Sequence, residues 1–153
     1  MQETDSTKVT ASDWGVLLLR VSLGIMFLAH SVVLKLFTYG LGGTAQFFVG
    51  VGLPGWPAYV VFVAEAVGGV LLVLGIQPRW VALALSPILL GALYSVHFAN
   101  GWVFTNPNGG WEYPVYLFVL CIAQVLLGDG PYAFGPSASL PGAIDRVAPA
   151  SSR

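Results

Sequence analysis

Residues 14–37 read WGVLLLRVSLGIMFLAHSVVLKLF, an apolar run that contains two basic residues, Arg20 and Lys35. A helix needs roughly 20 mainly apolar residues to cross a bilayer. The run therefore predicts a membrane-spanning helix. Because it is longer than the apolar core of a typical signal peptide and follows an acidic N-terminus, we expect it to be a permanent helix.

The rest of the chain repeats this pattern three more times. A tryptophan lies at or just before the start of each apolar segment, as expected for an anchor at the membrane interface. The expected helices cover residues 14–37, 56–76, 80–98 and 112–127. The sequence therefore predicts an all-α membrane protein, a bundle of four transmembrane helices in residues 13–134. Flexible cytoplasmic tails are expected at 1–12 and 135–153.

The composition favours the same class. The chain is 56% hydrophobic and 8% charged, whereas an average soluble domain carries roughly 25% charged residues. Only six charged residues lie between Trp14 and Phe134, and the formal net charge of −1 gives no indication of nucleic-acid binding. The single cysteine, Cys121, excludes an intramolecular disulfide, a CxxC redox pair and a cluster of thiolate metal ligands.

The links between the expected helices differ in character. Gly75 and Pro78 predict a tight turn between the second and third helices. The glycine-rich link at 38–55 predicts one or two helical turns on the membrane surface, with Thr44 as their N-cap. The link at 100–110 is rich in Gly, Asn and Pro, and we expect it to fold back over the bundle.

The distribution of basic residues predicts the orientation. With four crossings, the two tails and the turn after the second helix lie on one side of the membrane. That side carries Lys8, Arg79, Arg146 and Arg153, whereas the opposite side carries Lys35. Because cytoplasmic loops are enriched in Lys and Arg, both termini are expected in the cytoplasm.

Polar residues of different helices fall at similar depths when a rise of about 1.5 Å per residue is counted along each span. The outer half is expected to contain His30, Lys35, His97, Asn100 and Glu112, with Glu65 just beneath them. Ionisable side chains inside a membrane are costly and usually functional. This set is therefore the candidate site.

One face of the first helix is more polar than the others. By helical spacing it carries Arg20, Gly24, Phe27, Ser31 and Lys35. We expect this face to contact protein rather than lipid. An α-helical repeat places His30 about 80–100° around the axis from it, where it either still lines the bundle or faces a neighbour.

Glu65 needs a partner, because an ionised carboxylate alone in hydrocarbon costs at least about 3 kcal/mol. Arg20 and Lys35 are the candidate cations, and His30 is a candidate hydrogen-bond partner. Two alternatives stay open: the pair only holds the bundle together, or Lys35 extends to the membrane surface. The two histidines lie on different helices without an HxxxH or ExxH spacing, so we expect no metal site.

Several short blocks of sequence occur together in a characteristic order. They are LRVSLGIMFLAH at 19–30, KLF at 35–37, GLP at 52–54, EAVGG at 65–69, HFANG at 97–101 and GGWEY at 109–113. With these blocks the chain resembles the DoxX family of small membrane proteins. The resemblance implies a four-helix bundle in the bacterial cytoplasmic membrane. It also implies a link to quinone-coupled sulfur oxidation, or to an oxidative-stress assembly with a superoxide dismutase and a sulfurtransferase.

Three functions are consistent with these features. The first is a non-catalytic membrane subunit, with a polar intramembrane pocket, that anchors soluble redox or sulfur-transfer enzymes. The second is a subunit of a quinone-linked oxidoreductase that oxidises sulfur compounds or thiols. Its candidate catalytic residues are Glu65, His97 and Glu112, and its candidate ligand-binding residues are Arg20, His30, Lys35, Asn100, Trp111 and Tyr113. The third is a small transporter. The expected partners are the lipid bilayer, the soluble enzymes and a second copy of the chain.

Overall fold

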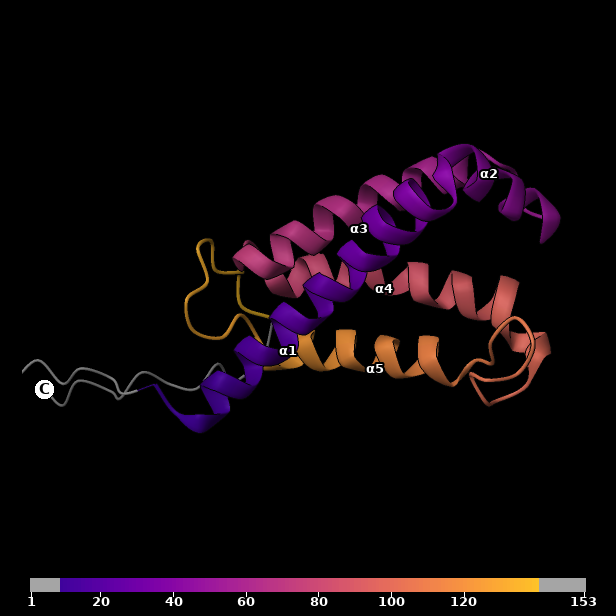
Figure 1. The fold of residues 1–153 in the computed structure, drawn as a ribbon. Helices are drawn as coiled ribbons and strands as arrows, with labels where there is room; N and C mark the ends of the chain where they lie inside the picture. The colour runs from indigo at the N-terminus through magenta and orange to yellow at the C-terminus, as the bar shows by residue number, and fades with distance from the viewer. Residues whose placement is uncertain (1–8, 141–153) are drawn as a thin grey trace, which may run out of the picture.

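The computed structural model describes residues 9–140, and in this range its regular structure is helical (Figure 1). The helices are α1 (Ala11–Leu28), the π-helix η1 (Ala29–Thr38), α2 (Gly40–Gly50), α3 (Pro57–Leu74), α4 (Pro78–Ala92), the π-helix η2 (Leu93–His97), the 3₁₀-helix η3 (Phe98–Asn100) and α5 (Glu112–Leu127). The only bridge between extended residues in this part of the chain is an isolated one that joins Ile76 and Gly135. The prediction of an all-helical chain is confirmed for these residues.

Within residues 9–140, three continuous helical segments are long and apolar enough to cross a membrane. They cover Ala11–Thr38, Pro57–Leu74 and Pro78–Asn100. The helix α5 is apolar but has only 16 residues. The chain is therefore a multi-pass membrane protein, whose helices begin and end within three residues of the limits expected from the sequence.

Local sequence explains where the helices start and stop. Thr10 and Asp13 form a capping box, in which each side chain bonds to the other's backbone N–H, so α1 begins at Ala11, before the apolar run itself. Gly75 ends α3 in the left-handed conformation (φ 71°), and Pro78 is the first residue of α4. The tight turn predicted between the second and third helices is confirmed.

The long helices form two pairs. The helix α1 packs along α3, and α4 packs along α5. In Figure 1 the two pairs lie close together at the end near the chain termini and diverge toward the end that carries α2. The α1–α3 contact is close because Gly24 and Gly69 face each other: a Cβ added at Gly24 would lie 2.8 Å from the Gly69 carbonyl oxygen.

The buried core lies between the two pairs. It consists of Leu23, Phe27, Leu72, Ala82, Leu85, Leu89, Leu117, Cys121 and Val125. The polar face predicted for the first helix is confirmed, since Arg20, Phe27 and Ser31 are each at most 1% exposed. Large apolar side chains also cover the outer surface of the helices, which is the pattern expected of a lipid-facing surface.

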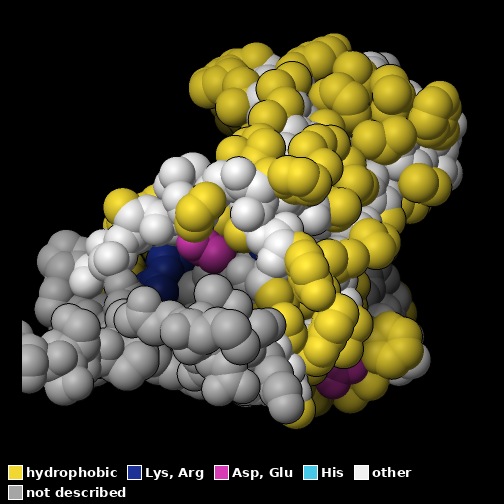
Figure 2. Space-filling view, turned by 90° about the vertical axis from the view of Figure 1, so that its left-hand side faces the viewer, with side chains coloured by type: hydrophobic (Ala, Val, Ile, Leu, Met, Phe, Trp, Pro, Cys, Tyr) yellow, Lys and Arg dark blue, Asp and Glu magenta, His cyan; other side chains and the backbone are white. Residues whose placement is uncertain are grey.

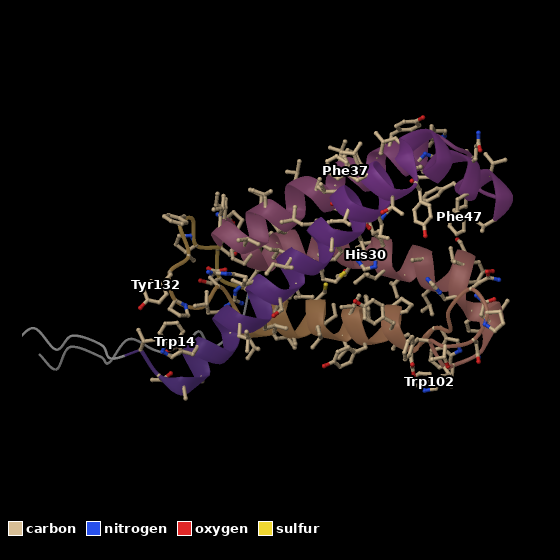
Figure 3. All side chains as sticks on the ribbon, viewed as in Figure 1. Trp14, His30, Phe37, Phe47, Trp102 and Tyr132 are labelled. Carbon is tan, nitrogen blue, oxygen red and sulfur yellow. The ribbon has the colours of Figure 1, made fainter. Side chains whose placement is uncertain are left out.

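Aromatic residues lie at both ends of the molecule. Figure 3 shows Trp14 and Tyr132 at one end and Trp102 and Phe47 at the other, with His30 between them. The Trp14 and Tyr132 rings are 5.7 Å apart. Aromatic side chains at two levels are typical of the two membrane interfaces.

The link between the first and second long helices contains a longer helix than expected. The helix α2 has 11 residues, about three turns, instead of one or two. The prediction that Thr44 caps it was wrong. Thr44 lies inside α2, where its Oγ1 donates hydrogen bonds to the carbonyl oxygens of Gly40 (3.0 Å) and Lys35 (3.2 Å), because a threonine hydroxyl inside a helix readily bonds to the carbonyl four residues earlier.

The chain after α5 returns across the end of the bundle as a strap, defined here as residues 128–137. Arg20 Nη1 donates to the Asp129 carbonyl oxygen (2.6 Å), Gln77 N to the Gly135 carbonyl oxygen (2.7 Å) and Arg79 N to Ser137 Oγ (3.1 Å). Figure 2 shows this end, where Lys or Arg side chains lie beside Asp or Glu side chains. Residues 135–137 of the expected flexible C-terminal tail thus make defined contacts.

The other parts of the expected tails, 1–8 and 141–153, lie outside the described residues. Lys8, Arg146 and Arg153, on which the predicted orientation depends, lie there too.

Candidate functional site

A cavity of about 710 Å³ lies between the two helix pairs, on the side of α2. Most of its lining is apolar and comes from α1, η1, α2, α3, α4, η2 and α5. Five of the nine expected site residues line it: His30, Lys35, Glu65, His97 and Tyr113. Its volume falls in the range of about 300–1,000 Å³ that is usual for small-molecule sites.

An ion pair forms the polar centre of this cavity. Lys35 Nζ on η1 donates a hydrogen bond to Glu65 Oε2 on α3, and the two side chains are 16% and 6% exposed. Lys35 is therefore the partner of Glu65, and the alternative in which it extends to the membrane surface was wrong. Arg20 does not reach Glu65, because its guanidinium is bound to the strap by the Asp129 and Tyr132 carbonyl oxygens.

The π-helix η1 places His30 and Lys35 on the same wall. Residues five apart lie about 140° apart around an α-helix, but a π-helix repeats its hydrogen bonds from i to i+5. The Tyr39 N–H accordingly bonds to the Leu34 carbonyl oxygen (3.0 Å). Of the two positions left open for His30, the structure shows the one in which it lines the bundle, and the angle of 80–100° assumed an α-helix where η1 is a π-helix.

The two cavity histidines have the same hydrogen-bond pattern. Nδ1 of His30 donates to the Met26 carbonyl oxygen (3.0 Å), and Nδ1 of His97 donates to the Gly109 carbonyl oxygen (3.0 Å). A carbonyl only accepts, so Nδ1 carries the hydrogen in both rings. In the neutral ring Nε2 is then a hydrogen-bond acceptor. His97 is the last residue of the second π-helix, η2.

Tyr113 supplies the wall from α5. Its ring stacks on His30 at a centroid distance of 6.2 Å and an interplanar angle of 23°. Tyr113 also lines a second, more open cavity of about 420 Å³ on the other side, together with Trp102, Glu112 and Tyr116. The His30–Tyr113 pair therefore joins the two helix pairs across the main cavity.

Of the other four expected site residues, Arg20 binds the strap, and the remaining three, Asn100, Trp111 and Glu112, make contacts in and around the loop 101–110. Asn100 Nδ2 donates to the carbonyl oxygens of Val96 (2.9 Å), Asn108 (3.3 Å) and Gly109 (3.0 Å). Glu112 Oε1 accepts from the Phe104 N–H (2.9 Å). The Trp111 ring lies 4.4 Å from that of Trp102, edge to face. The structure does not bring Glu112 together with His97 at one centre.

The sequence interpretation missed the part of the cavity wall that α2 and the residues after it supply. Phe47, Phe48, Val51 and Leu53 all line the cavity. In the sequence this region is an apolar segment between glycines. Such a segment alone does not indicate which part of the protein its side chains contact. Among residues 9–140, no group of three His, Cys, Asp or Glu side chains is arranged to hold a metal ion.

Comparison with known proteins agrees with the resemblance noted in the sequence. The DoxX family profile matches residues 15–98. The chain is 36% identical over 122 residues to the Bacillus subtilis (strain 168) protein named "Putative oxidoreductase CatD", covering 80% of this chain and 85% of that protein. No solved structure matches the chain. Both the family profile and this relative show that the chain is a member of the DoxX family.

Proposed function

We propose that this protein is the membrane subunit of a redox assembly and binds a neutral, lipid-soluble redox compound, a quinone, in its main cavity. The observation that carries the proposal is the cavity itself, about 710 Å³ of mainly apolar space with the Lys35–Glu65 pair and two histidines on its walls. Its B. subtilis relative is named as an oxidoreductase.

The charge of the cavity favours a neutral ligand. Lys35 and Glu65 form an ion pair with each other, so their formal charges cancel. An anionic sulfur compound would find no uncompensated cation among the described lining residues, and moving an unpaired charge into a mostly apolar cavity is costly. A ring with two carbonyl groups needs only hydrogen-bond partners and apolar contact.

The residues present fit such a ring. Lys35 Nζ supplies donors at one carbonyl position, and Nε2 of His30 and of His97 are acceptors for hydroxyl groups. Tyr113 offers an aromatic face beside His30. A bound quinone would supply two-electron, two-proton acceptor chemistry, with both electrons coming from a thiol or sulfur compound oxidised by a partner enzyme. Glu65 would hold or release a proton beside the ring.

The cavity supports this function more than the two alternatives. The anchor alternative includes a polar pocket, but anchoring itself gives no reason for a ligand-sized cavity with an ion pair and two histidines on its walls. A transporter needs a continuous path, whereas the cavity ends on Phe27, Leu89 and Leu117, which belong to the buried core. Soluble redox or sulfur-transfer enzymes are partners in this proposal, and a second copy of the chain is a further candidate.

The membrane arrangement is part of the same proposal. We place α5 as a fourth crossing, because it packs along α4. Its 16 residues span about 24 Å, which local thinning of a bilayer core of about 30 Å accommodates. Both termini, Arg79 and the strap would face the cytoplasm, in the bacterial cytoplasmic membrane, with α2 and the loop 101–110 on the outer side. Residues 13–134 would form the membrane domain.

The test is direct binding of a short-chain quinone, decylubiquinone, to the full-length protein in nanodiscs, measured by quenching of tryptophan fluorescence. We expect saturable binding that weakens at least about tenfold in the double variant Lys35→Met/Glu65→Leu, since a hydrogen bond to a charged group contributes about 1.5–3 kcal/mol. The double variant removes both charges together, so it leaves no unpaired ion.

Glu112→Gln is the matched control, because Glu112 is a carboxylate of the same molecule that does not line the main cavity. It should bind like the wild type. Absence of saturable binding in the wild type, or unchanged binding in the double variant, would refute the proposed site.

A further inference from the structure

The helix α2 forms one rim of the main cavity, and part of this rim is exposed. Phe47 and Phe48 on α2 line the cavity together with Val51 and Leu53, which follow the helix. Phe47 is nevertheless 51% exposed. In Figure 3 it lies in the space between α2 and the far end of α4.

The contacts of α2 are one-sided. It packs on η1 and α3, the helices of its own pair. The opposite rim of the cavity consists of His97 on η2 and Asn108 in the loop 101–110. The two rims thus belong to the two helix pairs, which diverge at this end (Figure 1).

Two glycines with positive φ lie at the ends of α2. Gly40 has φ 71° and Gly52 has φ 85°, and no atom lies within 4 Å of a Cβ added at either position. Packing therefore does not explain glycine there; the left-handed backbone does. Such positions absorb the dihedral changes of a hinged segment. The polar attachment of α2 to η1 is the bond from Thr44 Oγ1 to the Lys35 carbonyl oxygen.

From these features we infer that α2 is a hinged lid, described here in its open position, which closes toward η2 when a ligand enters the cavity from the membrane. Closure brings Phe47 over the ligand and removes its exposed face from lipid or water. This inference rests on the proposed ligand-binding function. It adds an entry route and a moving part that the site alone does not require.

The structure offers a way to hold the lid in its open position. A Cβ added at Gly55 would lie 3.6 Å from the Cβ of Ala45 in the middle of α2. That separation falls within the range of disulfides, roughly 3.5–4.5 Å. The variant Ala45→Cys/Gly55→Cys therefore joins α2 to the start of α3 across the Gly52 hinge, while the native Cys121 is buried and too enclosed to compete.

Decylubiquinone binding to this variant in nanodiscs, oxidised and then reduced, tests the lid. We expect the oxidised variant to release the probe about tenfold faster than the wild type, because the locked lid cannot bury the half-exposed Phe47 against the ligand. Reduction of the disulfide should restore the wild-type rate. The single variants Ala45→Cys and Gly55→Cys should not respond to oxidation. A spin-label pair at Val49 and Phe98, both exposed, should show a shorter distance when the probe is added.

The outcomes separate the two proposals. If the reduced protein binds the probe, but oxidation leaves the release rate unchanged and the probe leaves the Val49–Phe98 spin-label distance unchanged, the lid is refuted and the binding site stands. If the reduced protein does not bind the probe, the proposed function fails and the lid inference fails with it.

Discussion

Replacing Gly24 by alanine should destabilise the α1–α3 pair, although alanine is the better helix former. The added Cβ would lie 2.7 Å from Val73 Cγ2, 2.8 Å from the Gly69 carbonyl oxygen and 3.0 Å from Val73 N. Two of these three atoms belong to the backbone, so a change of rotamer cannot relieve the contacts. To reach an ordinary 3.4 Å contact with the Gly69 oxygen, the two helices must separate by about 0.6 Å (3.4 minus 2.8).

The expected cost follows from this separation. Overpacking of a tight core costs about 1–3 kcal/mol, and the higher helix propensity of alanine returns up to about 1 kcal/mol. If the full gain in helix propensity is realised, the variant should be less stable than the wild type by up to about 2 kcal/mol and less stable than Gly15→Ala, which has the same gain, by about 1–3 kcal/mol. For a chain of this size, each kcal/mol corresponds to roughly 2–4 °C in Tm.

Thermal unfolding in one detergent, followed by circular dichroism, measures this difference. Gly15→Ala is the matched control: it lies in the same helix, and no atom is within 4 Å of its added Cβ. It should unfold at the wild-type temperature or slightly above it. If Gly24→Ala and Gly15→Ala have the same Tm, the reasoning is refuted, because the backbones of α1 and α3 then do not lie as close together as the structure shows.

Three other predictions concern the polar groups. Lys35→Met should lower the free energy of unfolding by about 3–5 kcal/mol, because it leaves the Glu65 carboxylate buried without its cation. Adding Glu65→Leu should recover most of this loss. Thermal unfolding of the single and double variants tests both expectations. Arg20→Met removes the donors to the Asp129 and Tyr132 carbonyl oxygens, so proteinase K should cleave the strap faster while the helices stay intact, and equal cleavage would contradict the role given to Arg20. Asn100→Ala removes three hydrogen bonds of one side-chain amide. The backbone amides of Gly110 and Trp111 should then exchange with solvent hydrogen faster. Unchanged exchange rates at these two amides would mean that the loop holds its shape without Asn100.

Much of the fold could be predicted because hydropathy, glycine and proline act over short distances. The apolar runs locate the long helices, and Gly75 with Pro78 locates a turn. The polar face of the first helix could be predicted as far along the chain as Ser31, since α1 is a regular α-helix up to Leu28. These features depend only on neighbours within one or two helical turns.

The candidate site was harder to predict because two of its determinants are not local. The π-helix η1 changes the angular relation of His30 to Lys35, and periodicity arguments assume about 100° per residue. Arg20 binds carbonyl groups 109 and 112 positions later in the chain, which no spacing rule indicates. Depth alone placed Glu112 with His97, but Glu112 lines the second cavity and accepts from the Phe104 N–H, whereas His97 lines the main cavity.

The π-helix η1 makes the site depend on the number of residues in the chain as well as on their identity. A hydrogen-bonded π turn contains one residue more than an α turn, so η1 can be regarded as an α-helix that has accommodated an insertion. Deleting one residue between His30 and Lys35 would let η1 return to an α-helix, in which residues four apart lie about 40° apart on one face, whereas the native spacing of five in an α-helix would put them about 140° apart. Alignments of related chains that place a one-residue gap between these two positions should therefore mark proteins whose first helix is α-helical throughout and still carries both side chains on one wall.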